Sequence, residues 1–199
     1  KRLATLEGLV SPERVLPTVI EFVDIAGLVK GASKGEGLGN KFLANIREVD
    51  AIVHVTRCFD DDNIVHVDGV VNPVTDKEVI DTELQFKDLE SVDKKIQKTT
   101  KMAKTGDAKM RAELVVLEEY KTLLESGKNA RELELTEERK EAIDDMQLLT
   151  VKPVIYVANV EESAILTGNL HVEALKTAVA AEDAQVVMVS AAIESQIAE

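Results

Sequence analysis

Residues 74–150 contain no proline and only two glycines, Gly106 and Gly127, and this stretch constrains the fold more than any other feature of the sequence. Proline and glycine are the residues that most weaken a helix interior, so a long run almost without them favours continuous helix. The stretch is also richer in Lys, Arg, Asp and Glu than its flanks, as expected of helices that face water. We predict an inserted helical unit over residues 81–150.

Apolar residues at helical spacing divide this unit into helices that pack along one seam. The first helix is predicted to begin at Thr75, which forms a capping box with Glu78, and to run to about Lys104. Gly106 lies where the chain has to reverse, and Thr136 is predicted to cap a shorter return helix. The seam residues are Leu89, Val92, Ile96 and Ala103 on the first helix and Leu114, Leu117 and Leu124 on the second. This pattern predicts an antiparallel coiled-coil hairpin.

The flanking parts, residues 1–73 and 151–199, hold short β-branched runs separated by glycine, proline and asparagine. Four runs have strand length and are almost continuously apolar, which is typical of parallel strands covered on both faces. Helical spacing follows over Asn40–Val49 and again over His171–Ala181. The four runs are Thr18–Asp24, Ala51–Cys58, Pro153–Val160 and Gln185–Ser190. Alternating strands and helices predict a doubly wound α/β layer built from residues 1–80 and 151–199.

The composition argues against several classes of protein. A net charge of −13 disfavours a surface that coats DNA or RNA as a whole, and the absence of tryptophan disfavours a platform that stacks on single strands. No apolar run approaches the ~18 residues needed to cross a bilayer, and the single Cys58 cannot form an internal disulfide. We expect a cytoplasmic protein with neither a membrane nor a DNA partner. The net charge does not exclude a local basic patch.

The first candidate site follows the run Thr18–Asp24. Asp24 ends this run and Gly27 comes three residues later, which gives a D-x-x-G pattern. A carboxylate at the carboxyl end of a parallel strand lies where such sheets bind ligands. Asp24 could hold Mg²⁺ through a water there, while the backbone N–H of Gly27 approaches a terminal phosphate. The same pattern also fits a strand that ends in an ordinary turn.

Four glycines within nine residues come next, interleaved with lysine and glutamate. They are Gly31, Gly35, Gly37 and Gly39. Such a segment is costly to order, and it joins two core elements whose connections are usually short. A flexible linker and a loop that orders around a phosphate or a partner both fit, and the position in the chain favours the loop.

The segment Asp24–Asn40 resembles the switch II signature of the Obg-like ATPases of the YchF type, P-loop proteins of the translation-factor class. Residues 57–59 and 68–69 resemble the same family, and the resemblance extends over essentially the whole chain. It implies a Ras-like P-loop fold, ATP and Mg²⁺ as cofactors and ATP hydrolysis. It also implies association with the ribosome, and a loop, residues 28–39, that reorders with nucleotide state.

The family's base-reading motif can be placed on residues 159–162. This N-V-E-E follows the third apolar run, in the position of the N-K-x-D motif of GTPases. The resemblance implies that Asn159 and Val160 line the base pocket. It also implies that Glu162, which is longer than the usual Asp, no longer fits guanine, so that ATP is preferred over GTP. The turn that resembles the fifth motif, with backbone N–H groups that contact the base, contains Ser190 and Ala191.

Some family features do not occur in this sequence. It has no G-x-x-x-x-G-K-[ST] motif, which the family carries before the position of Lys1, and the family's small TGS domain would follow Glu199. Leu28 stands where many Ras-like enzymes place a water-orienting Gln. We therefore expect slow hydrolysis, and little tight ATP binding by these residues alone.

Three kinds of function are compatible with the sequence. The first is an ATPase in which Asp24 and Gly27 sense the γ-phosphate. The second is a ribosome- or RNA-binding module with incidental or no hydrolysis, in which a basic stripe on the first hairpin helix contacts ribosomal RNA phosphates. The stripe, which also fits a solvated face, is Lys94, Lys95, Lys98, Lys101 and Lys104. The third, a helical adaptor without nucleotide, is disfavoured because two ligand-type motifs fall at successive strand ends.

Overall fold

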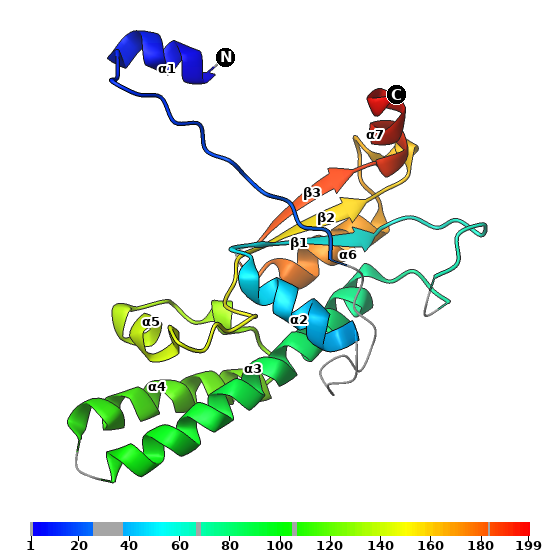
Figure 1. Cartoon of the computed structure of the whole chain (residues 1–199). Coiled ribbons are helices and arrows are strands. Elements are labelled where there is room, and N and C mark those ends of the chain that lie inside the picture. The colour runs from blue at the N-terminus through cyan, green and yellow to red at the C-terminus, as the bar shows by residue number, and fades with distance from the viewer. Residues whose placement is uncertain (1, 26–37, 67–68, 105–106, 183) are drawn as a thin grey trace.

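The computed structural model describes residues 2–25, 38–66, 69–104, 107–182 and 184–199, and for residues 38–41 the backbone alone. Figure 1 shows a small sheet from which a helical hairpin projects. The elements are α1 (Arg2–Val10), α2 (Leu38–Glu48), β1 (Ile52–Arg57), α3 (Pro73–Ala103), α4 (Ala108–Glu125), η2 (Ala130–Glu132), α5 (Glu137–Ile143), β2 (Val154–Asn159), η3 (Glu162–Ala164), α6 (Leu170–Val179), β3 (Gln185–Val189) and α7 (Ala191–Ala198). Among the described residues, no helix is both long and apolar enough to span a bilayer.

Three parallel strands form the sheet, in the order β1-β2-β3. The register pairs Val53 with Ile155, and Ile155 with Gln185. Parallel neighbours need crossover connections. The hairpin and α5 lie between β1 and β2, and α6 lies between β2 and β3. The three predicted strands that form this sheet are confirmed to within one residue at each end.

The fourth predicted strand, Thr18–Asp24, is wrong. These residues belong to no strand of the described sheet, and Figure 1 shows them within a long extended segment between α1 and the sheet. Val19 and Phe22 are 85% and 81% exposed. An apolar run favours extended backbone, but a strand also needs a neighbour that satisfies its N–H and C=O groups. None of the described strands supplies one here.

α6 and the first turns of α3 lie on the same side of the sheet. Tyr156, Ala158 and Val172 are fully buried in the layer between β2 and α6. The apolar runs predicted cover on both faces, but within the described residues the opposite face stays open. Its valine and isoleucine side chains are 41% to 62% exposed, and they are Val53, Val55, Ile155 and Val187.

α3 and α4 form the predicted antiparallel hairpin (Figure 1). Val92 and Leu117 of the predicted seam are fully buried, and Leu124 is 4% exposed. Gly106, the expected reversal point, lies outside the described residues. α3 runs unbroken through residues 80 and 81, so the division into residues 1–80 with 151–199 and an inserted unit over 81–150 stays a prediction.

The caps of the hairpin helices agree only in part with the sequence. Asn72, not Thr75, caps α3: its side chain accepts a hydrogen bond from the backbone N–H of Thr75 at 3.2 Å. Pro73 occupies the first helical position, where its missing N–H costs nothing and its fixed φ suits the helix. The helix therefore starts three residues earlier than predicted. Thr136 caps α5 as expected, because its hydroxyl accepts from the N–H of Arg139.

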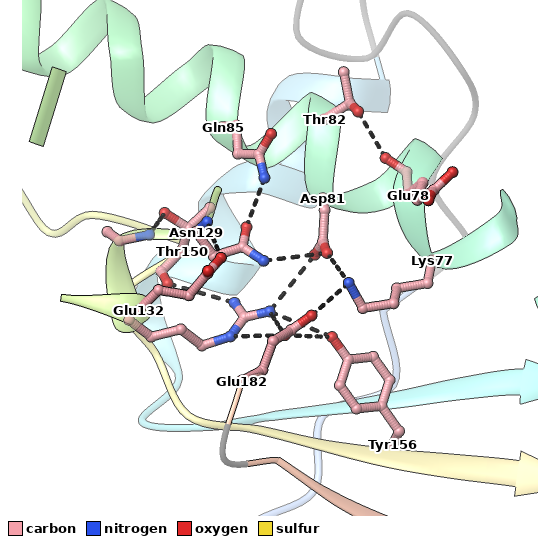
Figure 2. A network of polar contacts seen from close by, with 12 residues as sticks. Lys77, Glu78, Asp81, Thr82, Gln85, Asn129, Glu132, Thr150, Tyr156 and Glu182 are labelled. Carbon is pink, nitrogen blue, oxygen red and sulfur yellow. Dashed lines mark hydrogen bonds and ion pairs between the residues drawn. The ribbon is translucent and has the colours of Figure 1, made fainter. Parts of the chain in front are cut away.

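A buried polar cluster, which we call the joint, connects the hairpin to the sheet (Figure 2). Lys77 of α3 lies between two carboxylates, 2.6 Å from Asp81 and 2.6 Å from Glu182. Glu182, which follows α6, also pairs with Arg131 of η2 and accepts from the Tyr156 hydroxyl of β2 at 3.0 Å. The four charged side chains are 7% to 11% exposed and carry two charges of each sign. One neutral cluster thus holds together α3, η2, β2 and the residue that follows α6.

A second set of buried contacts lies two turns further along α3. The carboxylate of Asp88 accepts from the backbone N–H groups of Leu149 and Thr150, both at 2.8 Å, and from the Thr150 hydroxyl at 2.7 Å. The same hydroxyl accepts from the N–H of Ala130 at 3.0 Å. Among the described residues, no buried side-chain polar atom in either set lacks a partner.

Candidate functional site

The candidate site is the carboxyl edge of the sheet, where β1, β2 and β3 end side by side. The N–H of Cys58 donates to the carbonyl of Asn159 at 2.8 Å, and the N–H of Val160 donates to the carbonyl of Val189 at 2.9 Å. The strands therefore stay paired to their last residues. Open parallel sheets bind ligands at this edge, where loops from several strands meet.

Two polar groups at this edge are only partly matched. Asn159 ends β2, and its Oδ1 accepts from the backbone N–H of Ala191 at 3.1 Å. Its amide nitrogen donates to no acceptor among the described residues. Ser190 is 2% exposed, and its buried hydroxyl has no partner in the described part of the chain. Because buried hydroxyls are nearly always hydrogen-bonded, the unmatched Ser190 hydroxyl, beside the half-buried Asn159 amide, indicates a ligand site.

The two remaining predicted base-site residues lie differently. Val160 is 2% exposed and packs into the core beneath the edge, so it offers a ligand its backbone and not its side chain. Glu162 is exposed at the start of η3, and its carboxylate accepts from the Gln196 amide of α7 at 3.3 Å. This contact connects the loop after β2 to the helix after β3.

Asn169, which was not predicted from the sequence, connects three elements at the edge. Its amide nitrogen donates to the carbonyl of Cys58 at 2.7 Å and to the carboxylate of Glu161 at 3.1 Å. Its Oδ1 accepts from the N–H of Val172 at 3.1 Å and so caps α6. One side chain therefore connects the ends of β1 and β2 with the start of a helix.

Comparison with known proteins identifies the family of this fold. The family model described as "50S ribosome-binding GTPase" matches residues 8–189. The chain belongs to the 50S ribosome-binding GTPase family. The predicted fold class, an α/β P-loop GTPase sheet with an inserted helical hairpin, is confirmed by this match and by a solved structure. That structure, the YchF GTPase of Schizosaccharomyces pombe, superposes with a TM-score of 0.78 at 34% sequence identity and covers 98% of this chain and 54% of its own.

Curated relatives support the same family assignment. The chain is 50% identical over 200 residues to the ribosome-binding ATPase YchF of Bacillus subtilis (strain 168), and 52% identical over 198 residues to that of Escherichia coli O157:H7. Both alignments cover all of this chain and 55% and 54% of the relatives. The resemblance to YchF-type proteins is therefore confirmed, and the chain spans about half the length of the curated relatives it matches.

The Arg57 side chain stabilises the loop after β1. Its guanidinium donates to the carbonyls of Phe59 at 3.0 Å, Asp61 at 3.1 Å and Ile64 at 2.9 Å, and it lies 4.7 Å from the centre of the Phe59 ring. A cation with three carbonyl partners has a structural role. Arg57 thus shapes one wall of the edge and is not available to a ligand.

Only some of the residues that we expect to contact nucleotide phosphates lie within the described part of the chain. Asp24 is exposed in the extended segment, and its neighbour Ile25 packs against Leu43 and Ile46 of α2. Gly27 and Leu28 lie outside the described residues, as does the loop up to residue 37. The structure therefore brings Asn159, Ser190 and Ala191 together at one edge, and the roles of Asp24 and Gly27 stay predictions.

Proposed function

We propose that the carboxyl edge of the sheet binds the base of a purine nucleotide, and that the chain takes part in ATP binding and hydrolysis on the ribosome. The observation that carries the proposal is the buried Ser190 hydroxyl, which has no partner among the described residues and lies beside the half-buried Asn159 amide and the turn at Ala191. The names of the relatives, ribosome-binding ATPases, support the ligand and the partner. A ribosomal partner also implies a cytoplasmic location.

The chemistry of the edge fits a purine. The Asn159 amide donates to a ring acceptor while its oxygen stays on the Ala191 N–H, and the Ser190 hydroxyl both donates and accepts. ATP is preferred over GTP because a guanine-reading carboxylate must accept from the two neighbouring N–H groups of that base, and Glu162, which is longer than the usual Asp, does not fit them. The bond from Gln196 supports this preference, because it occupies a carboxylate oxygen of Glu162.

Asp24 and Gly27 are the residues proposed to bind Mg²⁺ and the γ-phosphate. Asp24 would hold Mg²⁺ through a water, and the backbone of Gly27 would meet the γ-phosphate. The cation, when bound, neutralises charge on the phosphate oxygens. The proposed conformational switch over residues 28–39 and the slow hydrolysis expected from Leu28 belong to this part of the proposal.

Nucleotide titration of the chain, followed by ligand-observed NMR because weak binding is expected, tests the base site. ATP is expected to bind more tightly than GTP, and Asn159→Ala is expected to weaken ATP binding roughly tenfold, as loss of one or two hydrogen bonds does. Asn45→Ala, on the exposed side of α2, is the matched control and leaves binding unchanged. Tighter binding of GTP than of ATP refutes the assignment of residues 159–162.

A second function, a ribosome- or RNA-binding module with incidental or no hydrolysis, is favoured by one observation. Lys94, Lys98, Lys101 and Lys104 are all exposed on α3. We propose that this face contacts ribosomal RNA phosphates. Reversing the charge of Lys94, Lys98 and Lys101 together is expected to reduce co-sedimentation with ribosomes, whereas unchanged pelleting favours a face that is only solvated.

A further inference from the structure

A groove of about 760 Å³ runs along α3 on the side where the end of α2 and residues 145–147 approach it. It is formed by side chains from the sheet body as well as from the hairpin. Six of its lining residues carry the argument, and they are Arg47, Lys87, Lys94, Lys95, Lys98 and Gln147. Lys101 and Lys104, which complete the basic stripe in the sequence, are not among its lining residues.

The groove is positive on a protein whose net charge is −13. Five of its lining residues are basic and three are acidic. The acids are matched from within the groove, because Lys87 lies 2.8 Å from Glu90, and Lys95 pairs with both Glu113 and Asp145. Arg47, Lys94 and Lys98 form no ion pair within the described residues, although Arg47 is close enough to the buried Asp88 to oppose the rise that burial causes in its pKa. The charges of Lys94 and Lys98 are available to an anion.

Arg47 adds an observation of a different kind. Its Nε–H is buried and has no acceptor among the described residues. The end of α2 that carries it is anchored, because the Lys152 ammonium donates to the backbone carbonyl of Arg47 at 3.1 Å and also to that of Val49. A buried donor without an acceptor requires an explanation, and a phosphate oxygen in the groove provides one.

The spacing of the free charges suits a chain of phosphates. Lys94 and Lys98 are one helical turn apart, which places their Cβ atoms ~5–6 Å from each other on one face of α3. Lys87, in the same groove, lies about 16 Å from Lys98 at 1.5 Å per residue, but its charge is already paired with Glu90. None of the residues that line the groove is aromatic, so the groove has no surface on which a base could stack.

We propose that this groove binds the phosphate backbone of RNA, with Arg47 of α2 and Lys94 and Lys98 of α3 as the phosphate-binding residues. The inference rests on the proposed ribosome association and narrows the RNA contact from the whole basic stripe to one groove along α3. Binding through phosphates alone makes the site indifferent to base sequence.

The test is fluorescence anisotropy of a short labelled oligo(U) RNA titrated with the chain. The paired replacement K94A/K98A is expected to weaken binding roughly tenfold, and to reduce the slope of log K against log salt by about 0.7 for each phosphate that the variant no longer neutralises. The matched control K101A/K104A removes the same charge from the same helix outside the groove. It is expected to weaken binding less than about threefold, because it removes only screened long-range attraction.

Arg47 is tested separately, because it comes from the sheet body. Arg47→Gln is expected to weaken RNA binding roughly tenfold, as loss of a charge-assisted hydrogen bond does. Arg14→Gln, on the exposed extended segment, is the control and leaves binding unchanged. Arg47→Lys keeps the charge but lacks the Nε–H, and is expected to fall between wild type and Arg47→Gln. Thermal melts of each variant show whether the fold is retained.

The following results would each contradict the proposed RNA site. If K94A/K98A and K101A/K104A weaken RNA binding equally, the whole stripe acts and the groove is refuted. If polyglutamate binds more tightly than oligo(U), the groove takes an acidic peptide. If oligo(U) does not bind while ribosomes still pellet the chain, RNA phosphates are not the ligand although ribosome association stands. If neither binds, the proposed association fails as well.

Discussion

The joint and the carboxyl edge of the sheet use buried polar groups in opposite ways. In the joint, Lys77, Arg131 and Tyr156 all have partners, as do the carboxylates they meet. At the edge, Ser190 is buried to the same degree, yet its hydroxyl has no partner among the described residues. A buried polar network stabilises a structure only when it is completely satisfied. The comparison separates a region whose polar groups hold the molecule together from one that we propose binds a ligand.

The charges of the joint also fix the pH range over which it holds. Burial alone would raise the pKa of Glu182, but Lys77 and Arg131 outweigh burial and lower this pKa below its ordinary value of 4.5. Burial alone would lower the pKa of Lys77, but Asp81 and Glu182 outweigh it and raise this pKa above 10.5. Both groups are therefore charged, and their pairing is retained, throughout the range between those two values.

The strongest way to break the joint is Glu182→Ala. This change leaves Lys77 and Arg131 buried close together with one carboxylate between them. We expect the free energy of unfolding to fall by about 3–5 kcal/mol, the usual result of removing one partner from a buried ion pair. Urea denaturation followed by circular dichroism measures the change.

A matched control for this loss is Glu173→Ala. Glu173 pairs with Lys176 on α6, and its side chain is 65% exposed. Its loss is expected to cost only about 0.2–1 kcal/mol, because water screens the pair. Equal losses for the two variants would show that the joint is no stronger than a surface ion pair.

Lowering the pH is expected to reduce the free energy of unfolding less than Glu182→Ala does. A carboxylate with a lowered pKa contributes stability above its ordinary value of 4.5, and this stability is lost as the pH falls through the folded-state pKa. The group adds a slope of up to about 1.4 kcal/mol per pH unit to the stability curve below that value. Glu182→Gln removes this contribution, so the difference between wild type and variant should narrow in acid. Urea midpoints between neutral pH and acid test this, and parallel curves would exclude Glu182 as the titrating group.

Thr150→Val sharpens the comparison at a single hydroxyl. The Thr150 hydroxyl has a donor and an acceptor partner, and the residue is fully buried. Valine keeps the shape but leaves the N–H of Ala130 without its acceptor. We expect a loss of about 1–3 kcal/mol in the free energy of unfolding, measured by urea denaturation. A neutral result would mean that the hydroxyl contributes nothing to the buried set around Asp88.

Ser190→Ala is the counterpart and has the smallest expected effect on stability. Its hydroxyl has no partner to lose in the described part of the chain, so the free energy of unfolding should change by less than about 0.5 kcal/mol or rise slightly. Nucleotide binding should weaken in the same variant, if the hydroxyl faces the base. A large loss of stability would place Ser190 with the structural hydroxyls and remove one support of the proposed base site.

The fold could be predicted from sequence wherever neighbours along the chain determine it. The seam around Val92 and Leu117 and the three strands of the sheet follow from the spacing of apolar residues. The segment Thr18–Asp24 shows the limit, because pairing depends on a partner strand that an apolar run does not supply. The cap of α3 shows another, since Asn72 followed by Pro73 is a stronger start signal than the capping box at Thr75.

The site could be predicted less completely than the fold. Asn159, Ser190 and Ala191 follow from the family resemblance, and their mutual contact depends on the parallel sheet. Asn169 could be read as a helix cap, but its bond to Cys58 spans 111 residues. Arg131 and Glu182 are 51 residues apart and come from segments with no shared pattern. Contacts of this kind arise from tertiary packing, and no local periodicity encodes them.

The unbroken course of α3 gives the joint a mechanical consequence. From Lys77 to Ala103 the helix extends about 39 Å at 1.5 Å per residue. A tilt of about 5° at the joint would therefore carry the far end of the hairpin through about 3 Å, roughly the length of one hydrogen bond. The angular stiffness of a few buried side chains thus sets how accurately the molecule can present a surface almost 40 Å away.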